Sequence, residues 1–308
     1  MLRKRQEDSM HAHRLNLSAG LASVGVALTL VALKLWALGE TAALSVAASL
    51  ADSAMDLMVS AGGLAAIAYA AKPADEDHAF GHSSAEDLAA LGQSAFILVS
   101  ASVIAWAAAR RLLADTPPDL AAETQGIAVM GVSILLTAGL VLWQRRVAAR
   151  TGSRVVRADS LHYLGDLIPN IGAIVSLWAS AQFGLGQIDS VVALGAAAML
   201  AIGAIRIGKG ATDALMDRRA DPTLISRIEA IAGDWPGVEG FHDLKTRTAG
   251  SRVFVNLHIE LDGQQSLEEA HAIGAALRRA IVNAVPAADV IIHKDPVGVE
   301  RHPDDPRE

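Results

Sequence analysis

The chain has 308 residues, of which 52% are hydrophobic, and a formal net charge of -7. A mean hydropathy of +0.35 is too apolar for an ordinary soluble domain and predicts several membrane-spanning segments, while the negative charge argues against nucleic acid as a partner. The chain contains no cysteine, which excludes disulfides and thiolate ligands, so a metal site here must use imidazole and carboxylate groups.

Six apolar stretches are long enough to cross a bilayer, because about 20 helical residues span its hydrocarbon core. They cover residues 14–38, 42–71, 86–113, 122–147, 155–181 and 189–210. We therefore predict a cytoplasmic tail over 1–13, a six-helix membrane domain over 14–215, a soluble domain over 216–298 and a short tail over 299–308. The first stretch is too long for a typical signal peptide, and five more follow it.

Lysine and arginine are concentrated at one end of these predicted helices. The N-terminal tail and the segment 145–157 carry most of them, whereas the opposite end has only Arg110 and Arg111. Because loops rich in Lys and Arg stay in the cytoplasm, both termini are predicted to be cytoplasmic.

The second apolar stretch contains two aspartates, Asp52 and Asp56, which stand one helical turn apart on the same face. In a soluble helix such a pair is typical of a hydrated surface. Inside a membrane each ionised aspartate costs roughly 2.5 to 3.5 kcal/mol, so this pair requires a compensating partner.

The segment that follows, "PADEDHAFGH", contains Asp75, His78 and His82. This spacing alone is weak evidence for a metal site, because it also fits an exposed polar turn.

The fifth apolar stretch repeats the pattern of the second, with His162 and Asp166 four residues apart. A lone buried histidine is more often a core residue than a ligand, but a second pair at the same spacing favours a shared site. Three carboxylates and one imidazole form a ligand set that suits tetrahedral Zn²⁺. Asp159 lies on the same stripe and is interpreted as lining the approach to the site rather than binding the ion.

After the sixth stretch the hydrophobic period changes. Residues 222–235 and 266–285 read as helices, and residues 251–261 alternate as a strand. With strands before 251 and over 288–295, the predicted order is αββαβ, a small sheet with helices on one face. His242, His258 and His293 fall on the strands, so they can converge at one edge of that sheet.

Together these motifs resemble the cation diffusion facilitator family, in particular its bacterial zinc and iron efflux branch, over about residues 14–297. The resemblance rests on D-x3-D, H-x3-D, the "PADEDHAFGH" segment and the C-terminal "WPGVEGFHDLKTR", "HIEL" and "IIHKDP". It implies a homodimer in the bacterial inner membrane, with six helices per protomer and a ferredoxin-like cytoplasmic domain, which exchanges a divalent cation for protons.

The resemblance also implies three metal sites. The transport site would use Asp52, Asp56, His162 and Asp166; the loop site, Asp75, His78 and His82; the cytoplasmic site, His242, His258, His271, His293 and Asp295.

Two positions depart from the family pattern. Ser84 stands where relatives often carry a lysine, so a dimer-bracing salt bridge to Asp217 cannot form in that way. Lys294, between His293 and Asp295, is expected to bring a positive charge beside the cytoplasmic site and to disfavour a second metal ion there.

The sequence thus predicts a non-enzymatic, proton-coupled exporter with Zn²⁺ as the first substrate and a structural or regulatory role for further Zn²⁺. One alternative keeps the fold and exports Fe²⁺, Cd²⁺ or Mn²⁺. Another is a membrane-anchored metal sensor. An intramembrane enzyme is disfavoured because the chain has neither an H-E-x-x-H motif nor a cysteine nucleophile.

Overall fold

The computed structural model describes residues 2–41, 44–113, 124–183 and 188–298. Within these ranges side chains are described except at 2–11, 37–38, 40–41, 44–49, 51–52, 124–130, 169–170, 172–183 and 188–189. The chain divides into two compact units, one over His11–Thr212 and one that contains Asp213 onward.

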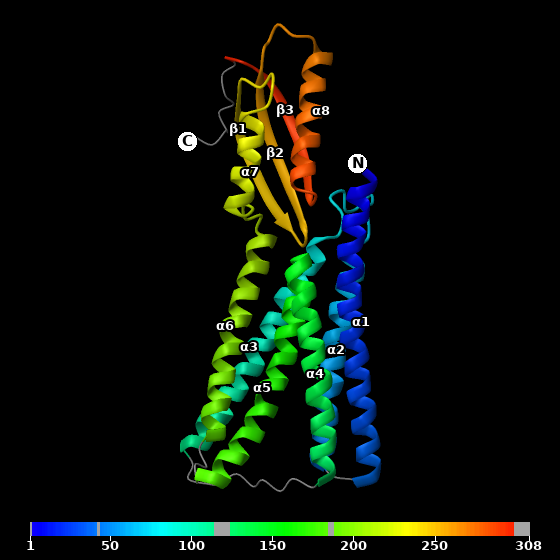
Figure 1. The fold of residues 1–308 in the computed structure, drawn as a ribbon, viewed down its shortest axis with the longest axis vertical. Helices are drawn as coiled ribbons and strands as arrows, with labels where there is room; N and C mark the ends of the chain where they lie inside the picture. Colours follow the sequence, from blue (N-terminus) through cyan, green and yellow to red (C-terminus); the bar gives the residue numbers. More distant parts are fainter. Residues whose placement is uncertain (1, 42–43, 114–123, 184–187, 299–308) are drawn as a thin grey trace. The chain divides into compact units, whose positions relative to one another are not determined.

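Six long helices make up the first unit and run side by side (Figure 1). They are α1 (Leu2–Thr41), α2 (Leu44–Ala70), α3 (Ser84–Leu113), α4 (Thr124–Thr151), α5 (Arg154–Phe183) and α6 (Ile188–Leu215). The predicted apolar stretches match them with one main difference, since α1 starts well before residue 14. Hydropathy marks only the part of a helix that suits lipid, whereas helical hydrogen bonding continues into the polar ends.

Five helices, α1, α2, α3, α4 and α6, are long and apolar enough to cross a membrane within the described residues. The other long helix, α5, carries the second half of its predicted span over residues whose side chains are not described. The helical membrane domain predicted from hydropathy is therefore confirmed.

Helix α5 lies at the centre of the packing, in contact with α2, α3 and α4. A core rich in alanine joins residues from all six helices, among them Ala19, Ala90, Ala158 and Ala211. Small side chains let helix backbones approach closely, which is the usual way that membrane helices gain packing energy. At Gly63 of α2, for example, an added Cβ would lie only 2.9 Å from the Gln93 side chain of α3.

The C-terminal unit confirms the predicted αββαβ order. It contains α7 (Pro222–Gly233), β1 (Gly240–Ala249), β2 (Arg252–Leu261), α8 (Leu267–Ala284) and β3 (Ala288–Pro296). The sheet has the order β1-β2-β3, in which β1 pairs antiparallel and β3 parallel with β2. Both helices start at capping side chains, Asp221 for α7 and Ser266 with Glu269 for α8.

Both helices of this unit cover the same face of its sheet. Ile228 of α7 and Leu277 of α8 pack with Val255, Leu257 and Ile259 of β2 in one apolar core. The alternation predicted for this strand is confirmed, and it directs the polar side chains to the opposite face. The histidines of the unit that lie on strands are therefore on the face that the helices leave open.

Candidate metal sites

The first cluster joins α2 and α5 inside the helix bundle. Asp56, His162 and Asp166 each offer a ligand atom, and these atoms lie within 4.8 Å of one another. His162 Nε2 is 3.0 Å from Asp56 Oδ1, close to the roughly 3.3 Å that separates two ligands of a tetrahedral zinc ion. Asp56 and His162 are only 7% and 8% exposed, so a charge in this pocket is poorly solvated.

Asp52 completes the predicted set but falls on a residue whose side chain lies outside the description. It belongs to α2, one turn before Asp56, and helical geometry puts both residues on one face. The structure thus brings together three of the four residues predicted for this site.

A hydrogen-bonded polar network lies one turn from this cluster. Gln144 of α4 donates to Asp159 at 2.6 Å, and Ser60 of α2 donates to the other oxygen of Asp159 at 3.4 Å. Ser60 also accepts from Ser23 of α1 at 2.8 Å and contacts the Tyr163 hydroxyl at 2.9 Å. The network ties four helices together around a buried carboxylate that does not belong to the ligand cluster.

Sequence reasoning did not identify Gln144 or Ser60. Ser60 lies four residues after Asp56, and this spacing could have indicated that both residues share one face of α2. Gln144 has no such signal, because its partner lies on another helix.

The second cluster, Asp75, His78 and His82, lies between α2 and α3, and its ligand atoms also lie within 4.8 Å of one another. Asp75 Oδ1 is 3.3 Å from His78 Nδ1, and Asp75 Oδ2 is 3.4 Å from His82 Nε2. Both distances match those between two ligands of one tetrahedral ion.

His82 is held in an orientation suited to metal binding. Its Nδ1 lies 3.3 Å from the carbonyl oxygen of Lys72, an arrangement in which Nδ1 carries the proton and Nε2 keeps its lone pair. Nε2 is buried and has no hydrogen-bond partner within the described residues. A buried nitrogen in this state is a natural ligand, because it otherwise loses hydrogen bonding to water.

Lys72 interacts with the same aspartate. Its Nζ lies 2.5 Å from Asp75 Oδ2, and this hydrogen bond together with the His78 backbone N–H holds the pKa of Asp75 well below its usual range. The same contact raises the pKa of Lys72. The carboxylate is therefore ionised at neutral pH, but a bound ion has to compete with the ammonium group.

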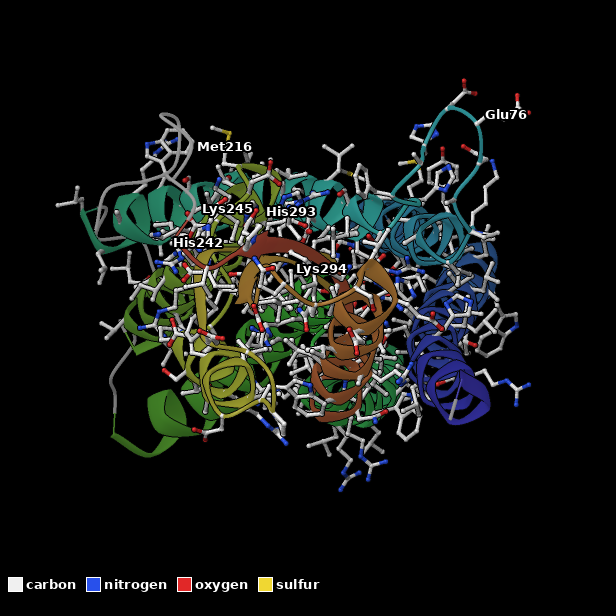
Figure 2. All side chains as sticks on the ribbon, turned by 90° about the horizontal axis from the view of Figure 1, so that it is seen from above. Glu76, Met216, His242, Lys245, His293 and Lys294 are labelled. Atoms are coloured by element: carbon white, nitrogen blue, oxygen red, sulfur yellow. The ribbon has the colours of Figure 1, made fainter. Side chains whose placement is uncertain are left out.

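The third cluster is a row of residues across the sheet. His242 of β1 pairs with His258 of β2, which pairs with His293 of β3, so the three histidines stand next to one another. Figure 2 shows His242 and His293 close together. Asp295 Oδ2 lies 2.9 Å from His258 Nδ1 and 3.6 Å from His242 Nε2, and these ligand atoms form one group.

Two acidic residues near this row were not predicted. Glu260 accepts from His242 Nδ1 at 2.9 Å, which leaves Nε2 of that ring free to face Asp295. Asp243, in left-handed backbone conformation with φ of 49°, brings Oδ2 within 3.8 Å of His258 Nε2. Glu260 lies two residues from His258 on the polar side of β2, so strand alternation was a signal for it.

Three further predictions concern residues near this cluster. His293 contacts Asp295 at 3.2 Å, whereas His271 lies exposed on α8 and is not among the described residues grouped at this site. The expectation for Lys294 was wrong. Its side chain packs against α8, where a Cβ added at Gly274 would lie 2.5 Å from Lys294 Cε, because neighbouring strand residues face opposite sides.

Asp217, which was expected to lack a lysine partner for a dimer-bracing salt bridge, contacts a residue of its own unit. Its carboxylate lies 3.1 Å from Arg247, whose guanidinium stacks on Phe254 at 4.3 Å.

Family models match both units. Residues 20–216 match the cation efflux transmembrane domain, and residues 220–297 match the cytoplasmic domain of cation efflux proteins.

Relatives cover nearly the whole chain. The chain is 45% identical to the cation-efflux pump FieF of Shewanella oneidensis over 92% of its own length and 94% of the relative. It is 40% identical to FieF of Cronobacter sakazakii, with 93% and 94% covered. Among solved structures, the metal-bound C-terminal domain of the CzcD transporter from Thermotoga maritima is 27% identical, with a TM-score of 0.25, and covers 27% of this chain and all of that one.

Proposed function

Because this chain belongs to the cation efflux family, we propose that it exports a divalent metal cation from the cytoplasm in exchange for protons. It is a multi-pass membrane protein and a cation efflux transporter. The proposal adds the metal, with Zn²⁺ first, the proton coupling, an inner-membrane location with both termini cytoplasmic, and a homodimer.

The observation that carries the proposal is the cluster of Asp56, His162 and Asp166 between α2 and α5. Ionisable side chains within membrane helices are costly and generally mark an ion pathway. One imidazole with carboxylates is a mixed nitrogen and oxygen set that Zn²⁺ accepts in tetrahedral geometry. Carboxylate-rich sites also accept harder ions, so Fe²⁺, Cd²⁺ and Mn²⁺ are the alternative substrates.

Proton coupling follows from the charge of this site. Three ionised aspartates, Asp52 included, give the empty site a charge of about -3, which a divalent cation reduces to about -1. The empty site therefore attracts protons. Metal binding requires the neutral imidazole of His162, so protons and metal compete for the same ligands.

A direct test is metal flux into sealed proteoliposomes with and without a transmembrane pH difference. We expect uphill transport of Zn²⁺ that stops when the pH difference is removed. Comparison of Zn²⁺ with Cd²⁺, Fe²⁺ and Mn²⁺ ranks the substrates. Metal binding without any flux would contradict the proposal and would favour a metal sensor.

The role of His162 can be tested separately. Metal affinity would be measured from about pH 5.5 to 7.5, the range in which imidazole titrates, in the unmodified protein and in His162→Ala. We expect the variant to retain some binding with a weaker pH dependence. Identical pH profiles would assign the coupling to the aspartates instead.

The other two clusters are proposed as resident metal sites. The free Nε2 atoms of His82 and His242, each aimed at an aspartate, fit a bound cation. His78 and Asp75 would complete the loop site, while His258, His293 and Asp295 would serve the C-terminal one, with His271 as a further proposed ligand. Such ions would order a loop or bias the position of a domain, and they need not be transported.

A further inference from the structure

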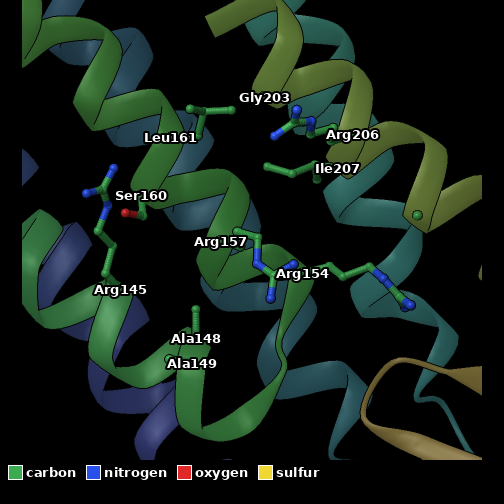
Figure 3. A pocket seen from close by; sticks show the side chains of 11 residues that line it. Arg145, Ala148, Ala149, Arg154, Arg157, Ser160, Leu161, Gly203, Arg206 and Ile207 are labelled. Atoms are coloured by element: carbon green, nitrogen blue, oxygen red, sulfur yellow. The ribbon is translucent and has the colours of Figure 1, made fainter. Parts of the chain in front are cut away.

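A cavity of about 400 Å³ lies between α4, α5 and α6, near the turn that joins α4 to α5. Figure 3 shows that arginines from all three helices line it. They are Arg145 of α4, Arg154 and Arg157 of α5, and Arg206 of α6. None of these residues belongs to the three metal clusters.

Helical spacing explains why these side chains meet. On α6, Gly203, Arg206, Ile207 and Gly210 recur at intervals of three and four residues and so share one face. The two glycines open this face. At Gly203 an added Cβ would lie 2.7 Å from the Leu161 side chain, and at Gly210 it would contact Arg154 Nε at 3.5 Å.

The other two helices contribute similar faces. Arg154, Arg157 and Leu161 line the cavity from α5, and Arg145 lines it from α4 together with two alanines. Ser160, which is buried, adds a hydroxyl. The cavity is thus walled by small and apolar residues and edged by guanidinium groups.

Most of this positive charge has no acidic counterpart. Arg154 is paired with Asp87 of α3 at 2.5 Å. Within the described part of the chain, no carboxylate forms an ion pair with Arg145, Arg157 or Arg206. Four arginines and Asp87 leave a charge of about +3 around the cavity, or about +2 when Glu86, which also interacts with Arg154, is ionised; either charge disfavours a metal cation and attracts an anion.

We propose that this cavity binds the phosphate group of an anionic ligand. Guanidinium groups match phosphate oxygens with paired hydrogen bonds, and basic pockets between membrane helices suit anionic lipid headgroups. Ile202 and Ile205, which precede Arg206 on α6 by four residues and by one, are more than half exposed and offer apolar surface for acyl chains. This favours a phospholipid over free phosphate as the source of the group.

The test uses the purified full-length protein in a neutral detergent. Phosphatidylglycerol would be titrated in, with phosphatidylcholine as the reference lipid whose phosphate is balanced by a choline cation, and bound lipids would be counted by native mass spectrometry. We expect saturable binding of phosphatidylglycerol only. Competition by inorganic phosphate distinguishes the two sources. A site for soluble phosphate would bind inorganic phosphate but would not bind phosphatidylglycerol.

A matched pair of variants separates this site from general attraction between arginines and anionic membranes. Arg157→Gln with Arg206→Gln removes two cavity arginines, and we expect binding to weaken roughly 25-fold, about fivefold for each arginine. Arg146→Gln with Arg150→Gln removes two exposed arginines of α4 that do not line the cavity, and we expect little change.

The pair Arg157→Lys with Arg206→Lys keeps the charge but loses the paired hydrogen bonds, so it should bind phosphatidylglycerol more tightly than the glutamine pair and less tightly than the unmodified protein. If the glutamine pair does not fold, Arg206→Gln alone decides, with an expected loss of about fivefold. Equal losses in the cavity pair and the control pair, or no saturable binding of either phosphatidylglycerol or inorganic phosphate, would overturn the proposal.

Discussion

The membrane cluster and the C-terminal cluster use the same side-chain types in different settings. The side chains of His162 and Asp56 on the helices are only 8% and 10% exposed, whereas those of His258 and Asp295 on the sheet are 29% and 23% exposed. Water can replace a lost ligand in the second cluster but hardly in the first. The same kind of substitution should therefore have unequal effects in the two places.

The two clusters also differ in how they are encoded. Each helical pair is visible in the sequence, because residues four apart share a helix face whatever surrounds them. The sheet cluster depends on which residues of three strands stand opposite one another, and this register follows from pairing across the whole unit.

The largest expected effect is loss of transport in Asp166→Asn, and equally in Asp52→Asn. Removal of an anionic ligand from a buried site of four should lower metal flux by at least about 100-fold, beyond the usual cost of losing a supporting hydrogen bond. Proteoliposome flux is the measurement. Asp77→Asn, an exposed residue outside the clusters, is the control. Near-normal flux in either ligand variant would remove the transport-site proposal.

The second prediction concerns stability around Asp159. Gln144→Leu removes the 2.6 Å hydrogen bond to this buried carboxylate, and we expect a cost of about 1 to 3 kcal/mol in the free energy of unfolding. Thermal unfolding in detergent would detect it as a lower apparent Tm.

A second buried glutamine gives a matched control for that change. Neither side-chain polar atom of Gln93 has a hydrogen-bond partner within the described residues. Gln93→Leu should therefore cost less than Gln144→Leu or even stabilise the protein. Equal losses in the two variants would show that the hydrogen bond to Asp159 contributes little.

The third prediction tests the exposed cluster. His242→Ala with His258→Ala should weaken metal-dependent closing of the C-terminal domains in the dimer, while flux at saturating metal stays near normal. Because the chain has no cysteine, one introduced in Ser251→Cys can carry a label for distances between protomers. Asn256→Ala, also on β2, is the control. Unchanged metal-induced distances in the double variant would contradict the C-terminal site.

The sequence predicts an interaction more readily when the two residues lie close together along the chain. Hydropathy and helical spacing predicted the membrane helices and the acidic pairs, which depend on neighbouring residues. The Asp217–Arg247 contact joins residues 30 positions apart, and Gln144 meets Asp159 only when α4 packs on α5. Such partners are set by the tertiary fold. The direction of Lys294, by contrast, could have been predicted from strand alternation.

The smallest expected effect belongs to the loop cluster, which is more exposed than the membrane cluster and already carries a competing cation. Lys72→Met removes the ammonium group from Asp75, so metal affinity at the loop should rise a few-fold. The same change should bring the pKa of Asp75 back toward its ordinary value, since the Lys72 hydrogen bond is the first cause of its lowering.

The lowered pKa of Asp75 determines how metal binding at the loop should depend on pH. Because the pKa of Asp75 is lowered in the folded protein, its contribution to loop stability is present above the ordinary aspartate pKa near 4 and is lost only as the pH falls through the lower folded value. Between about pH 7 and 5.5, therefore, Asp75 stays ionised, and loss of metal from the loop in this range is not caused by its protonation. Titration of loop metal binding in Lys72→Met and in Arg150→Met, an exposed cation of α4 outside the metal clusters, would measure the difference. If Lys72→Met bound metal no more tightly than the unmodified protein, Lys72 would not compete with the ion for Asp75.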